Sequence, residues 1–67
     1  MTFTIQTHDS WGTVKVGTFQ SLAQARKVFS SLCDDPWYKS DGMVKGVELL
    51  QDADHGEGTR IDWFAFR

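Results

Sequence analysis

The segment from Ser21 to Pro36 carries the strongest structural signal in the chain. Ser21 stands three residues before Gln24, which is the capping-box spacing that marks the start of a helix. Apolar side chains then recur at helical spacing in one stripe, which consists of Leu22, Ala25, Val28, Phe29, Leu32 and Cys33. Pro36 disfavours helical geometry in the residue before it, so the helix should end near Asp34 or Asp35. The chain must therefore provide one apolar surface that covers this stripe.

Segments of alternating character precede the helix. Residues 2–8 and 13–19 each alternate between apolar and polar side chains, a pattern typical of half-buried strands. The intervening residues 9–12 are turn formers, so the two segments are predicted to form a β-hairpin. In its second strand, Val14 and Val16 are expected to point inward.

Two further strands are predicted after the helix. Residues 36–42 read as a loop closed by an Asp-Gly turn, and residues 43–51 as a strand that Gly46 weakens. A turn at 52–58 leads to a last strand at 59–66. There, simple alternation places Ile61, Trp63 and Ala65 on one face and Asp62, Phe64 and Phe66 on the other.

These elements predict a single α+β domain over residues 1–67. It has a four-stranded antiparallel sheet with one helix packed on one face, in the order ββαββ. Strand orders 1-2-4-3 and 2-1-3-4 both keep the sheet antiparallel, and the pattern does not choose between them. Because the last strand carries aromatic residues on both faces, either Trp37 and Tyr38 add a second layer or aromatic surface is left for a partner. The small size of the domain favours the second layer, because aromatic rings bury much surface.

Composition indicates a soluble protein of a reducing compartment. One cysteine allows no internal disulfide. The N-terminal residues resemble neither a signal peptide nor an anchor, and no apolar stretch reaches the ~18 residues of a membrane span. The expected localisation is cytoplasmic, or the host cytoplasm if the protein comes from a phage.

Signals for enzymatic chemistry are weak. Cys33 is a possible nucleophile, but it continues the apolar stripe of the helix and is expected to be a small buried hydrophobe. His8 and His55 are possible bases, but a strand end and a turn suggest solvated side chains. We therefore predict that the protein is not an enzyme.

Residues 52–58 invite a calcium-loop interpretation, which fails on spacing. Counted from Asp52, the fifth, sixth and twelfth positions are Gly56, Glu57 and Trp63, where an EF-hand needs an oxygen ligand, glycine and glutamate. One cysteine and two histidines also lack the paired spacing of a zinc site. No metal or cofactor is predicted.

Charge is distributed very unevenly along the chain. Residues 34–62 hold eight of the nine carboxylates against three basic residues, a net charge of −5 (3 − 8), whereas residues 1–33 have a net charge of +2 (3 − 1). Turns favour Asp for local hydrogen bonding, but Asp34 and Asp35 lie at a helix C-terminus, where the dipole disfavours them. We therefore predict an acidic surface with aromatic anchors that docks on a basic partner protein. The predicted partner-binding residues are Asp34, Asp35, Trp37, Tyr38, Asp41, Asp52, Asp54 and Glu57.

Two alternatives stay open beside a protein-binding inhibitor. Aromatic residues on both faces of residues 59–66 suggest a homo-oligomeric module, so the protein could be a monomer or a weak homodimer. Phe64 and Phe66 could also stack on unpaired bases, although the seven basic residues are scattered and provide no groove for phosphates. We do not expect direct nucleic-acid binding.

In size, acidity and compact α/β make-up, with no identifiable catalytic residues, the chain resembles small bacteriophage inhibitor proteins of the anti-CRISPR type. The resemblance covers the whole chain and rests on no shared motif. It implies a non-enzymatic inhibitor that binds a CRISPR effector subunit, and some members imitate DNA with their carboxylates. A basic nucleic-acid-binding site of a host defence protein is the partner that it implies.

Overall fold

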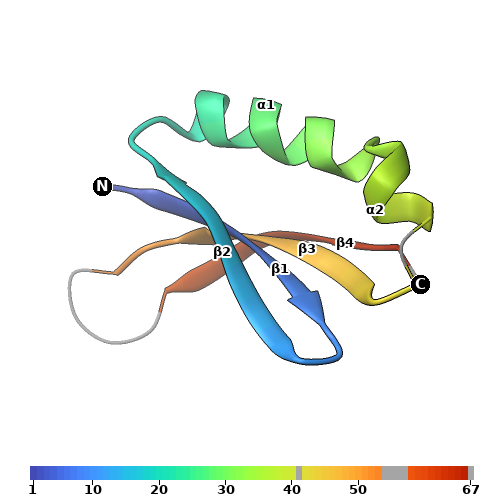
Figure 1. Cartoon of the computed structure of the whole chain (residues 1–67). Helices are drawn as coiled ribbons and strands as arrows, with labels where there is room; N and C mark the ends of the chain where they lie inside the picture. Colours follow the sequence, from blue (N-terminus) through green and yellow to red (C-terminus); the bar gives the residue numbers. More distant parts are fainter. Residues whose placement is uncertain (41, 54–57, 67) are drawn as a thin grey trace.

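The computed structural model describes residues 1–40, 42–53 and 58–66. The elements in chain order are β1 (Phe3–Asp9), β2 (Gly12–Phe19), α1 (Leu22–Cys33), α2 (Pro36–Ser40), β3 (Val44–Gln51) and β4 (Thr59–Ala65). All strands pair antiparallel in one sheet of order β2-β1-β3-β4, and α1 lies across one side of it (Figure 1). The predicted α+β class and four-stranded antiparallel sheet are confirmed, and the structure selects the second of the two open strand orders.

The ends of α1 follow the local sequence signals. The Ser21 hydroxyl accepts a hydrogen bond from the Gln24 backbone N–H at 3.4 Å, which supplies one half of the predicted capping box. The helix ends at Cys33, with Asp34 as its C-cap. Pro36 then begins a second helix, α2, where a loop had been predicted. Proline suits the first position of a helix, because its missing N–H would have no intrahelical partner there.

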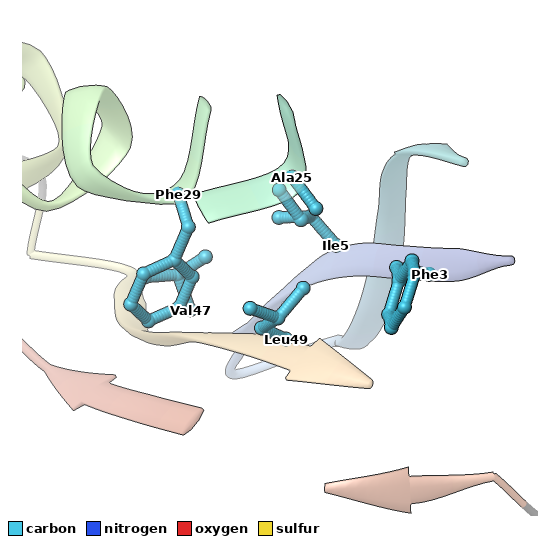
Figure 2. Packing of buried hydrophobic residues seen from close by; sticks show 6 residues of the cluster. All are labelled: Phe3, Ile5, Ala25, Phe29, Val47 and Leu49. Atoms are coloured by element: carbon cyan, nitrogen blue, oxygen red, sulfur yellow. The ribbon is translucent and has the colours of Figure 1, made fainter. Parts of the chain in front are cut away.

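The core lies between α1 and the two central strands. Among the described residues, its buried cluster takes side chains from β1, β3 and α1, namely Phe3, Ile5, Ala25, Phe29, Val47 and Leu49 (Figure 2). We call the sheet face that bears Phe3, Ile5, Val47 and Leu49 the covered face. The opposite face, which bears Thr4, Gln6, Glu48 and Trp63, is called the open face.

Two predictions for the edge strands are wrong, one about burial in β2 and one about facing in β4, and each of these strands contains a bulge. In β2, Lys15 pairs with Gln6 and Gly17 with Ile5, so Val16 is an extra residue. Val14 and Val16 are 55% and 40% exposed rather than inward, since the buried cluster does not extend to this edge strand.

The bulge in β4 changes the position of Ile61. Asp62 pairs with Leu49 and Arg60 with Leu50, which leaves Ile61 as the extra residue. Ile61 packs against the core on the covered face, whereas Trp63 lies opposite Glu48 on the open face. Simple alternation had predicted that Ile61 and Trp63 share a face, but they lie on opposite faces.

Candidate functional site

The structure places the predicted acidic surface in two separate regions. Asp34 and Asp35 join α1 to α2, whose first residues include Trp37 and Tyr38. Asp52 follows β3 at the opposite end of the sheet from α2 (Figure 1). Asp41, Asp54 and Glu57 lie outside the described residues. The described carboxylates of the predicted site therefore do not meet on one surface.

The α2 end of the molecule gives its two carboxylates different roles. Asp35 Oδ1 accepts a hydrogen bond from the Trp37 backbone N–H at 2.8 Å, at the start of α2. An acidic side chain is favourable at a helix N-terminus. Asp35 directly precedes α2, so the dipole of α2 stabilises the carboxylate that the dipole of α1 disfavours. The Asp34 side chain is 83% exposed, with one carboxylate oxygen 3.9 Å from Lys39 Nζ. Asp35 thus has a structural role, whereas Asp34 presents its charge to solvent.

Four aromatic rings continue from α2 to the end of β4 in a contiguous row. The Trp37 ring meets the Tyr38 ring edge-on at 5.1 Å between centroids, and Tyr38 stacks on Phe66 at 5.9 Å. Phe66 in turn contacts Phe64 edge-on at 5.3 Å. We call these four residues the aromatic row. The predicted second layer from Trp37 and Tyr38 forms only in part, because Tyr38 packs on Phe66 while Trp37 is 62% exposed.

Asp52 belongs to a hydrogen-bonded group on the open face. Its carboxylate accepts hydrogen bonds from Thr2 Oγ1 at 2.7 Å and from Thr4 Oγ1 at 2.8 Å. Its backbone N–H also donates to the Thr2 carbonyl at 2.9 Å. These bonds tie the end of β3 to the start of β1, which gives Asp52 a structural role.

A group of polar side chains that we did not predict surrounds Glu48 on the open face. Glu48 is only 5% exposed. Its Oε1 atom lies 2.7 Å from Gln6 Nε2 and 2.9 Å from His8 Nε2, and its Oε2 accepts from Arg60 Nε at 2.5 Å. Trp63 closes the group, with its ring edge-on to His8 at 5.0 Å and the Arg60 guanidinium 5.0 Å from its centroid. We call these five residues the Glu48 network.

Strand register creates this network. Gln6 and Trp63 both lie directly opposite Glu48, one from β1 and the other from β4. His8 had been predicted to be solvated, but it is engaged by both Glu48 and Trp63, and its side chain is 29% exposed. His55 lies outside the described residues. The sequence signal for this network was the polar alternation of residues 2–8. It placed Gln6 and His8 on one face, but it did not show that Glu48 and Trp63 are their partners.

Two opposing effects act on the Glu48 carboxyl. Burial on its own raises its pKa, but hydrogen bonds from Gln6, His8 and Arg60 and the charge of Arg60 outweigh burial, so that the pKa lies below its ordinary value. Glu48 is therefore an ionised, hydrogen-bonded carboxylate at neutral pH. It positions the Arg60 guanidinium and the His8 ring beside Trp63.

The Glu48 network predicts a specific acid sensitivity. Because the folded pKa is lowered, the unfolded chain takes up the proton first as the pH falls, at about 4.3. The stabilisation from ionised Glu48 is thus fully present above that pH and is lost as the pH falls through the folded pKa. Urea unfolding of native protein and Glu48→Gln between pH 3 and 6 should show a stability difference that shrinks on acidification. A difference independent of pH would contradict this assignment.

Cys33 has the electrostatic environment of an unreactive thiol. Burial, together with the neighbouring charges of Asp34 and Asp62, raises the pKa of its thiol, and Lys39 opposes this only in part. The thiolate is the nucleophilic form of cysteine, so this environment does not activate Cys33. Within residues 1–40, 42–53 and 58–66, no pocket and no metal-binding group of His, Cys, Asp and Glu side chains is found.

Comparison with known proteins gives no family for this chain: no family model, curated protein or solved structure matches it. In the described part of the chain, neither helix has the length and apolar character needed to cross a membrane.

Proposed function

We propose that the protein is a non-enzymatic protein-binding domain whose α2 end docks on a basic surface of another protein. The observation that carries this proposal is the 62% exposure of Trp37 beside the exposed carboxylate of Asp34. A tryptophan that fills a pocket of a partner is a frequent energetic centre of protein interfaces. A neighbouring carboxylate adds charge selectivity and accelerates encounter with a basic partner.

The aromatic row supports this proposal because it limits the freedom of the anchor. The Trp37 ring packs edge-on against Tyr38, and Tyr38 stacks on Phe66 at the end of β4. Asp35 holds the first turn of α2 through its bond to the Trp37 N–H. A side chain that is already ordered loses less entropy on binding, so more of its contact energy contributes to affinity.

The more specific form of the proposal is an inhibitor, encoded by a phage, that occupies a nucleic-acid-binding site of a host defence protein, as the anti-CRISPR resemblance implies. Its support is the acidic pair between α1 and α2, where Asp34, with a side chain that is 83% exposed, is followed by Asp35. In such a complex, carboxylates would meet the basic side chains that otherwise contact phosphates. The proposed contact residues are Asp34, Asp35, Trp37 and Tyr38, with Asp41 next to them in the sequence.

The test is capture of a partner from nuclease-treated bacterial lysate by tagged protein. Trp37→Ala and Asp34→Lys should each weaken binding at least tenfold, and added salt should weaken native binding. Asp35→Asn is used instead of a charge reversal, because asparagine can still cap α2. The matched control is Asp52→Asn, which removes a carboxylate at the other end of the sheet and should leave binding unchanged.

Circular dichroism of each variant establishes that the fold is intact. Capture that survives both Trp37→Ala and Asp34→Lys would show that the α2 end is not the docking surface. Loss of capture only in Asp52→Asn would move the binding site to the other end of the sheet.

A further inference from the structure

The β4 edge of the sheet has hydrogen-bonding groups that face away from the molecule. The Phe66 N–H donates to the Lys45 carbonyl of the β3 segment at 2.9 Å. In an antiparallel ladder, inward and outward backbone groups alternate along a strand. Since β4 is an edge strand, the N–H and C=O groups of Trp63 and Ala65 therefore point outward, whereas those of Phe64 point towards β3. The outward Trp63 N–H donates to Asp62 Oδ1 at 2.8 Å, so pairing with another strand must transfer this N–H to a new acceptor.

The two edges of the sheet differ in how they are protected from pairing with another strand. The β2 edge carries Lys15 next to a bulge, and both features discourage strand addition. The β4 edge has its own bulge at Ile61, but the stretch beyond it, from Asp62 to Ala65, contains no bulge, lysine or proline. Its single charge, Asp62, lies 3.5 Å from Arg26 of α1 in the same chain. This stretch is thus a regular edge without an unpaired charge.

We propose that a second copy of this chain pairs with β4 in antiparallel register, with the two-fold axis at Phe64. The proposal goes beyond the docking of a partner at α2 and does not depend on it. In this register Trp63 lies opposite Ala65 of the second copy. Their outward backbone groups pair on both sides of the axis once the Trp63 N–H exchanges Asp62 Oδ1 for the Ala65 carbonyl of the second copy. Phe64 lies opposite its own equivalent in a non-hydrogen-bonded pair, where side chains approach most closely.

The side chains of this stretch are self-complementary in size and charge. On the open face, Trp63 lies opposite the small Ala65 of the other copy, and its ring can stay over Gly46 and beside His8, so that pairing displaces no packed side chain there. On the covered face, the two Phe64 rings, each 38% exposed, meet each other as an aromatic pair. Asp62 lies opposite Phe66, so no like charges face each other. A register centred on Asp62 would place two carboxylates opposite each other and is disfavoured.

The contact is short, so association should depend on concentration. Sedimentation velocity of the native protein should show a mass that rises from one chain, 7.6 kDa, towards twice that value as concentration increases. Phe64→Lys places two like charges on the axis and should weaken association at least tenfold. Trp11→Lys is the matched control, because Trp11 is 84% exposed at the far tip of the β1–β2 hairpin and should not affect association.

Mixing Phe64→Lys with Phe64→Glu tests the register itself. Opposite charges then face each other across the axis, so the mixture should form a heterodimer although neither variant associates alone. Circular dichroism of each variant checks its folding. A native protein that stays at the mass of one chain at every concentration would overturn the proposal. So would association that Phe64→Lys leaves unchanged, or a mixture that forms no heterodimer.

Discussion

Replacing Gly46 with alanine is expected to destabilise the fold by about 2–3 kcal/mol, the upper range for overpacking a well-packed site. A Cβ atom at this position would lie 2.4 Å from Trp63 Cζ2 and 2.8 Å from the backbone oxygen of Phe64. The Trp63 ring therefore rests directly on the glycine, and β4 approaches β3 too closely for a side chain there. Either Trp63 must leave its place beside His8 and Arg60, or the two strands must separate.

Chemical unfolding followed by tryptophan fluorescence would measure this loss. A domain of 67 residues has a total stability of roughly 3–10 kcal/mol, so the variant should unfold at a much lower urea concentration. The matched control is Gly42→Ala, since a Cβ atom at Gly42 would meet nothing within 4 Å. Equal stability of the two variants would show that Trp63 does not rest on Gly46.

A double-mutant cycle shows how much of the cost comes from the Trp63 ring and how much from the Phe64 carbonyl. Trp63→Leu removes the two ring carbons nearest to Gly46, so Gly46→Ala should cost less in that background. Part of the cost should persist, because the Phe64 carbonyl does not move with the side chain. An identical cost in both backgrounds would assign the whole effect to the backbone contact.

Local signals in the sequence predicted most of the secondary structure. The alternation of residues 2–8, the capping residue Ser21 and the stop at Pro36 each act within a few residues. The short helix α2 was missed because its N-cap, Asp35, overlaps the end of α1, so the residues appeared to form only a helix stop and a loop.

Features that depend on pairing between distant strands could not be predicted in the same way. The β1–β3 pairing joins residues that are 35 to 48 positions apart, and it decides which polar side chains meet Glu48. The bulges in β2 and β4 reverse the facing of single residues, such as Ile61, that alternation assigns otherwise.

The same limit applies to the candidate site. Asp34, Asp35 and Trp37 lie at one end of the molecule because they are near one another in the sequence. Position in the chain could not show that Asp52 lies at the opposite end, nor that Tyr38 stacks on Phe66. The carboxylates of residues 34–62 are thus spread over separate regions, which a single partner surface would not contact together.

Replacing Glu48 with alanine should destabilise the protein by about 2–3 kcal/mol, because the change removes a buried carboxylate that accepts three side-chain hydrogen bonds. Gln6, His8 and Arg60 would each lose their common acceptor. We expect less than the full cost of breaking a buried ion pair, since Arg60 is 54% exposed and water can solvate its guanidinium.

Thermal unfolding at neutral pH measures this effect, and a loss of this size should lower the melting temperature by roughly 10–20 °C. Glu48→Gln should reduce the stability by about half as much as Glu48→Ala, because glutamine keeps the size and one acceptor oxygen of the side chain but not its charge. The control is Asp62→Asn, which removes a carboxylate from the exposed pair with Arg26 and should cost less than about 0.5 kcal/mol.

Comparison of these variants separates burial of Glu48 from its charge. If Glu48→Ala is no more harmful than Asp62→Asn, the carboxylate is solvated in solution and the network does not hold the three strands together. If Glu48→Ala and Glu48→Gln lower the stability equally, the charge of Glu48 is the stabilising property, because glutamine retains the shape of the side chain. A graded loss instead means that hydrogen bonding and charge both contribute. In that case Arg60→Ala should cost less in the Glu48→Ala background than in the native protein, because its ionic partner is already absent.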